Sequence, residues 1–115
     1  MQVYDKAYEL AAEIKRSDEY REYEQLKGPV MADETNKKLI AEYKKLQLEA
    51  QAAYLSGNAP NDETMDKLKA LGGLLGFNRD VAAYLAAEYK LQTMVGDVYK
   101  IIGDACGIGL DFLSE

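Results

Sequence analysis

The chain has 115 residues, which fits a single domain with a modest core and leaves little room for a deep pocket as well. Its 48% apolar and 30% charged residues exclude a disordered chain and indicate long, solvated helices. The formal net charge of -6 disfavours direct nucleic-acid binding, which depends largely on neutralising phosphates with lysine and arginine, although Lys37–Lys38 and Lys44–Lys45 form two local basic pairs.

The N-terminal segment predicts two consecutive helices. Apolar residues recur every three or four positions from Val3 to Ile14, with charged residues on the opposite side. Ser17 is suited to accept a hydrogen bond from the free amides of a new helical turn, and Asp18 and Glu19 suit the positive end of a helix dipole. We therefore expect a second helix from about residue 18, or a bend of the first helix there. The inward-facing residues of this second segment would be Tyr20, Tyr23, Leu26 and Val30.

The pair Gly28–Pro29 interrupts this pattern. Proline has no amide donor and its ring crowds the preceding turn, so a kink or a fresh helix start is expected there. Asp33, followed by Glu34, is a clear N-cap for a long helix that ends near Leu55. The buried line of this long helix would consist of Leu39, Tyr43, Leu46, Ala50 and Ala53, with Ile40 and Tyr54 beside it.

The segment SGNAPND, residues 56–62, predicts a hairpin loop, because it gathers residues that end helices and form turns. Asn61 or Asp62 would cap a shorter helix after the loop. Asn78 would cap the last and longest helix, about residues 79–105, which at 1.5 Å per residue is roughly 40 Å long. The shorter helix would turn inward Met65, Leu68, Leu71 and Leu75.

These elements predict an all-α fold, a helical hairpin or bundle with two long helices and shorter flanking helices. No run of β-branched residues alternates with polar ones before the extreme C-terminus, so strands are not expected there. Residues 1–107 are predicted to form a single helical domain, followed by an apolar C-terminal tail at residues 108–115.

The tail has an extended pattern, in which Ile108, Leu110 and Phe112 alternate with small or polar residues. Large apolar side chains so close to the end of a chain favour docking, so we predict that the tail packs into a groove through Phe112, on its own helices or on a neighbouring subunit. Disorder of the tail is the alternative, because termini commonly fray.

Few residues are suited to catalysis. The chain has no histidine, the commonest general base and metal ligand. The three serines fall at a predicted cap, a turn and the C-terminus, where local hydrogen bonding explains them. Cys106, the single cysteine, has no basic neighbour closer in sequence than Lys100, so a packed or helix-end thiol is expected.

The rival hypothesis is a divalent-metal-dependent helical nucleotide hydrolase. Glu19 and Glu22 lie one helical turn apart, the spacing with which helical nucleotide pyrophosphatases hold magnesium. That chemistry needs a second acidic pair on a facing helix, and Asp97 and Asp104 are seven positions apart with no Glu-x-x-Asp beside them. Charge on a solvated helix explains the acidic segment more simply, so no catalytic, cofactor-binding or metal-binding residue is expected.

The last helix has an apolar stripe that one carboxylate, Glu88, interrupts. An isolated buried carboxylate is severely destabilising, so Glu88 must be exposed, protonated or paired. Pairing or exposure at the edge of the stripe is favoured, and one polar residue in an apolar seam can fix the register of a helical assembly. A second apolar line flanks the first, which indicates a helix wrapped by its own domain or shared with another subunit. The predicted interface residues are Tyr84, Glu88, Leu91, Val95, Val98, Ile102 and, in the tail, Phe112.

The expected cellular location rests on three features that the sequence does not have. No basic segment followed by an apolar run opens it, and no stretch of about 18 apolar residues occurs. A single cysteine cannot form an internal disulfide, which agrees with a reducing compartment. We therefore expect a cytoplasmic protein that does not enter a membrane.

Four phrases of the sequence carry a resemblance to a known family. They are VYDKAYELAAEIKRSDEYREYEQLK near the N-terminus, VMAD before the long central helix, LSGNAP at the predicted turn and YLAAEYKLQTMVGDVYKIIG in the last helix. Together they resemble the YlbF/YmcA family of small helical proteins of Gram-positive bacteria, over about residues 2–105. The resemblance rests on element order and short phrases, and it implies the same all-α fold.

The resemblance also implies a function. In that family YlbF and YmcA are regulatory adaptors that associate with YaaT and with the endoribonuclease RNase Y, and they influence mRNA processing, competence, sporulation and biofilm formation. YheA-like members have no settled role. A chain of this family is expected to be a non-enzymatic adaptor, or a YheA-like relative, that self-associates and binds a larger YaaT- or RNase Y-like protein. Iron–sulfur clusters are associated with the three-protein complex, but Cys106 alone supplies at most one ligand, so no cofactor is expected.

Overall fold

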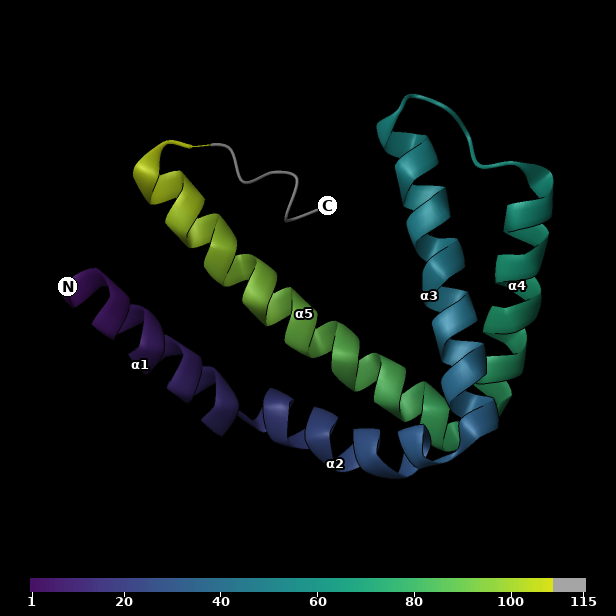
Figure 1. Cartoon of the computed structure of the whole chain (residues 1–115), viewed down its shortest axis with the longest axis horizontal. Helices are drawn as coiled ribbons and strands as arrows, with labels where there is room; N and C mark the ends of the chain where they lie inside the picture. The colour runs from purple at the N-terminus through teal and green to yellow at the C-terminus, as the bar shows by residue number, and fades with distance from the viewer. Residues whose placement is uncertain (109–115) are drawn as a thin grey trace. The chain divides into compact units, whose positions relative to one another are not determined.

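The computed structural model describes residues 1–108, which form five helices and no strand (Figure 1). The all-α prediction is confirmed, and the two longest helices, α3 and α5, have 22 and 28 residues. The predicted contact of the tail through Phe112 lies outside the described residues. The helices are α1 (Gln2–Arg16), α2 (Asp18–Ala32), α3 (Glu34–Leu55), α4 (Asp62–Phe77) and α5 (Arg79–Cys106).

Short polar side chains start four of these helices. The Ser17 hydroxyl donates to the carbonyl of Ile14 at 2.6 Å and accepts from the amide of Tyr20 at 3.2 Å, so it ends α1 and starts α2. Each of the other three caps accepts hydrogen bonds from free amides of the first turn, which satisfies donors that have no partner within the helix. These caps are Asp33 for α3, Asn61 for α4 and Asn78 for α5.

The predicted fresh helix start at Gly28–Pro29 is wrong, because α2 runs through Pro29 to Ala32. A proline in a helix removes one amide donor, here the one that would bond to the carbonyl of Gln25. This hydrogen bond is missing near the end of α2, where only one further turn of helix follows it. The next helix, α3, starts at the Asp33 cap instead. The alternative expectation, a kink, stays a prediction.

The chain divides into two compact units, and α2 and α5 contribute to both. Among the described residues, unit 1 contains Met1–Gln25 and residues 85–108, whereas unit 2 contains Leu26–Tyr84. The prediction of a single domain over residues 1–107 stays a prediction.

Unit 2 is built around a hairpin in which α3 and α4 pack side by side (Figure 1). Gly57, in the connecting loop, has a φ of +83°, a conformation that favours glycine. Tyr43 of α3 covers Gly72 of α4, since a Cβ on Gly72 would lie 3.6 Å from a ring carbon of Tyr43. The core of this unit consists of Val30, Ile40, Leu46, Ala50, Leu75, Val81 and Tyr84.

The predicted buried line of α3 is confirmed for Leu46 and Ala50, and Ile40 beside it is buried as well. Tyr54, also predicted beside this line, is 62% exposed in the last turn of α3, next to the loop. The remaining predicted residues, Leu39, Tyr43 and Ala53, are half-buried.

Candidate assembly surface

Helix α1 is strongly two-sided, and yet none of its residues is buried. At about 100° per residue, its apolar positions cover roughly 160° of the circumference. Val3, Tyr4 and Tyr8 are 66%, 65% and 77% exposed, and Leu10 is 39% exposed. We call these four side chains the α1 face.

The uncovered area of the α1 face is large for one short helix. An aromatic side chain carries 150–250 Å² of surface, so Tyr4 and Tyr8 alone leave on the order of 200–350 Å² uncovered. Single chains rarely expose apolar patches above a few hundred Å² unless the patch binds something. The α1 face therefore has the properties of a contact surface without its partner.

Most charged side chains of α1 lie away from this face, and four of the six pair with each other, whereas Lys15 follows Tyr8 by seven positions and lies on the apolar side. Lys6 Nζ lies 3.2 Å from Glu9 Oε2, and Arg16 pairs with Glu13. The helix carries three acidic and three basic residues, so it has no net charge. A protein partner therefore meets an apolar face on an electrically neutral helix.

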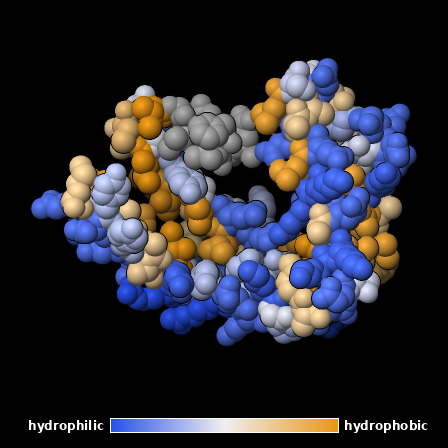
Figure 2. Space-filling model, viewed as in Figure 1, coloured by the Kyte–Doolittle hydropathy of each residue, from blue (hydrophilic) through white to orange (hydrophobic). Residues whose placement is uncertain are grey.

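The part of α5 in unit 1 is apolar over a wide arc, and its C-terminal end carries three exposed large apolar side chains close together. Ile101 and Ile102 are 68% and 44% exposed, and Tyr99 is 43% exposed. Figure 2 shows apolar residues in orange over this segment of α5. Ala87, two residues from the start of the segment, is buried at 1% exposure. The exposed end of α5 thus provides a second apolar surface in the same unit as the α1 face.

The structure separates the predicted interface residues into three environments. Tyr84 is 1% exposed in unit 2, where it contacts Lys44, so its contact is intramolecular. Glu88 is half-buried and interacts with a neighbouring group. Ile102 is exposed in unit 1, and Phe112 lies beyond the described residues. The half-buried members in unit 1 are Leu91, Val95 and Val98.

The α1 face is the surface that sequence reasoning missed as a candidate site. The signal was present, since the period of the apolar residues from Val3 to Ile14 is helical. That period says which side of a helix is apolar, and it says nothing about whether another element covers that side.

The acidic residues proposed for the rival hydrolase are not gathered into a metal site within residues 1–108. Glu19 is half-buried and Glu22 exposed, and no group of three or more Asp, Glu, Cys or His side chains in this range could hold a metal ion. Cys106 is exposed as the last residue of α5, the helix-end position expected for it.

No helix among residues 1–108 combines the length and apolarity that crossing a membrane requires.

Comparison with known proteins identifies relatives over nearly the whole chain. The family described as "Control of competence regulator ComK, YlbF/YmcA" matches residues 3–106. A UPF0342 protein of Halothermothrix orenii is 36% identical over 110 residues, covering 96% of this chain and 93% of its own. A UPF0342 protein of Desulfitobacterium hafniense is 38% identical over 105 residues, covering 91% of this chain and 85% of its own.

A solved structure has the same fold. It is titled a protein of unknown function (DUF964) from Bacillus stearothermophilus, and it superposes with a TM-score of 0.72 at 19% sequence identity. The match covers 93% of this chain and 94% of that one. The likeness at this identity concerns the fold alone.

Proposed function

Since the chain belongs to the YlbF/YmcA family, whose description names control of the competence regulator ComK, we propose that it is a non-enzymatic adaptor that self-associates and binds a larger regulatory protein. One observation carries the proposal: α1 has a wide apolar side and no buried residue. Burial of apolar surface is the main driving force of protein association, and an uncovered helix face supplies it.

The charges of α1 favour a protein over a lipid surface as its partner. Helices that lie on anionic membranes carry lysine and arginine in excess on the polar side. In α1 the three basic residues are matched by three acidic ones, and two of the pairs are in contact. A further copy of the chain, with an equally apolar face, is therefore the simplest partner for the α1 face.

The regulatory part of the proposal rests on the family. Its named members control competence, and the resemblance in sequence extends this to a YaaT- or RNase Y-like partner and to mRNA processing. The described residues hold no group of metal ligands, and binding through helix faces requires none. The proposed role is to hold a partner in place, with no bond made or broken by this chain.

Light scattering of the purified chain at high micromolar concentration tests the self-association. The native protein should have a mass greater than that of one chain, and Tyr8→Asp should shift it towards the monomer because a charge then lies in the buried contact. Tyr54→Asp is the matched control, since it makes the same substitution at an exposed tyrosine of unit 2. A native protein that stays monomeric, or equal behaviour of the two variants, contradicts the proposal.

Co-purification from the native cell tests the larger partner. Tagged native protein should retain a YaaT- or RNase Y-like protein that mass spectrometry identifies, and Tyr54→Asp should retain it equally. Recovery of only the chain itself at native expression levels would contradict this part of the proposal and leave self-association intact.

A further inference from the structure

Helix α3 has an exposed row of residues on the side that faces away from its buried line. The row repeats every three or four positions, which places its members on one side of the helix, and all of them are exposed. It extends over about 27 Å at 1.5 Å per residue. We call it the α3 row, and it consists of Lys37, Ala41, Lys45, Leu48, Ala52 and Leu55.

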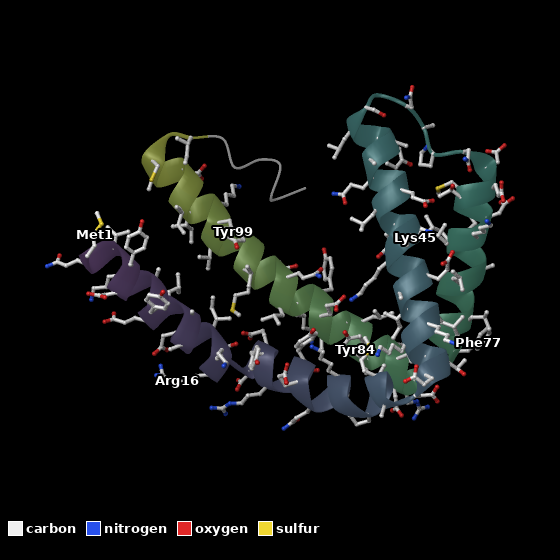
Figure 3. All side chains as sticks on the ribbon, in the orientation of Figure 1. Met1, Arg16, Lys45, Phe77, Tyr84 and Tyr99 are labelled. Atoms are coloured by element: carbon white, nitrogen blue, oxygen red, sulfur yellow. The ribbon has the colours of Figure 1, made fainter. Side chains whose placement is uncertain are left out.

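The α3 row has a basic end and an apolar end. Lys37 and Lys45 occupy the N-terminal half, whereas Leu48 and Leu55, each 66% exposed, occupy the C-terminal half. Figure 3 labels Lys45 near the middle of α3. Isolated exposed leucines are ordinary on protein surfaces. Here two of them continue a line of lysines and alanines, on which the one acidic residue is Glu34, three positions before Lys37 at the start of the helix.

Charge sets α3 apart from the rest of the chain. It carries four lysines and three glutamates, hence +1, whereas the remaining residues carry 10 basic and 17 acidic groups, hence -7, in a chain of net charge -6. It is the one helix of the five with more basic than acidic residues. Lys44 is engaged with the ring of Tyr84, but Lys38 is exposed next to the row.

We propose that the α3 row, together with Lys38, binds an acidic amphipathic helix of a partner protein. Carboxylates of that helix would lie over the lysines, and its apolar side chains would pack on Leu48 and Leu55. Complementary charge sets the direction and rate of such an encounter, while the apolar contact holds the complex. This inference deepens the proposed adaptor function, because it gives the chemistry of the partner's binding segment.

Other occupants fit the α3 row less well. A nucleic acid would meet only three exposed lysines on an acidic chain, and the leucines offer nothing to phosphates. A second copy could offer the acidic start of α2, which has no exposed large apolar residue for Leu48 and Leu55, or the apolar face of α1, a helix without the net negative charge that would match the lysines. An acidic helix with its own apolar stripe can pair with the lysines at one end of the row and pack on the leucines at the other.

Fluorescence anisotropy with labelled peptides and the full chain tests the proposal. The probe is a helical peptide of about 18 residues, the length of the row, with glutamates on one half and leucines at helical spacing on the other. The comparison probes are the same peptide with glutamine for glutamate, and an oligouridine. We expect the acidic peptide to bind at least about tenfold tighter than the glutamine peptide, and the difference to shrink between about 50 and 200 mM salt.

Two double variants test the basic half and the apolar half of the α3 row separately. Lys37→Glu with Lys45→Glu should weaken the acidic peptide at least about tenfold, since like charges then face each other. Lys69→Glu with Lys90→Glu changes the net charge equally at exposed positions of α4 and α5 and should have little effect. Leu48→Ser with Leu55→Ser should weaken binding at every salt concentration. All six positions are exposed, so circular dichroism should show native folding throughout.

Several results would overturn the inference. They are equal affinity for the acidic and glutamine peptides, equal loss in the two lysine double variants, no binding of the acidic peptide, or tighter binding of oligouridine. Light scattering on the same samples separates this inference from the proposed function. If the row variants change the oligomer size, the row is a contact between copies and the partner assignment fails, whereas self-association stands.

Discussion

The ammonium nitrogen of Lys44 lies 5.9 Å from the centroid of the Tyr84 ring, which connects the middle of α3 to the start of α5 inside unit 2. A cation at this distance over an aromatic face is attracted by the ring's quadrupole. Tyr84 is 1% exposed and Lys44 is half-buried, so the contact is partly shielded from water.

A double-mutant cycle should detect this contact. Lys44→Met keeps the stem and removes the charge, and Tyr84→Leu removes the ring. Chemical denaturation should give a coupling free energy of about 0.5–1 kcal/mol between the two changes. The cycle cancels what either residue contributes through contacts with any third group. Purely additive losses would show that the geometry carries no interaction energy.

Tyr84 and Phe77 form a matched aromatic pair for testing the core of unit 2. Phe77 is 93% exposed at the end of α4, whereas Tyr84 is 1% exposed. Tyr84→Ala should lower the free energy of unfolding by about 3–5 kcal/mol, through lost burial and the cavity left behind. Phe77→Ala should change it by less than about 0.5 kcal/mol. Similar losses from the two substitutions in urea titrations would contradict this core.

Substitution by alanine should change the stability of the chain in opposite directions at Gly57 and Gly73. The φ of +83° at Gly57 is costly for any residue with a Cβ, so Gly57→Ala should destabilise the chain by about 1–2 kcal/mol. A Cβ on Gly73 meets nothing within 4 Å in the middle of α4, so Gly73→Ala should stabilise it by about 0.5–1 kcal/mol. Thermal denaturation of both variants measures the difference, and shifts of the same sign would refute the assigned loop geometry.

Magnesium should not bind at the acidic start of α2. The ion prefers octahedral oxygen coordination, usually through carboxylates together with waters and phosphates, and residues 1–108 gather no group of three candidate ligands. Calorimetric titration with magnesium or manganese should therefore give the same heats for the native chain and Glu22→Gln. Clear binding by the native chain that Glu22→Gln abolishes, together with nucleotide turnover, would instead support a hydrolase.

Helix boundaries were predictable from the sequence because their causes are local. Ser17, Asp33 and Asn78 lie within three residues of the amides that they accept from, so the capping interaction is contained in a few adjacent positions. The five helices and the loop between α3 and α4 follow from such signals. The failure at Gly28–Pro29 has the same origin, since a local helix breaker near the end of α2 costs only one hydrogen bond.

Burial could not be predicted in the same way, because it depends on residues that are distant in sequence. Tyr84 and Tyr89 lie on the same helix, and yet they are 1% and 71% exposed. The apolar side of α1 is as regular as a core helix, but no described element covers it enough to bury a residue. The sequence determined which side of each helix is apolar, and the tertiary structure decided which of those sides are covered, since covering requires an opposing surface that helical periodicity does not encode.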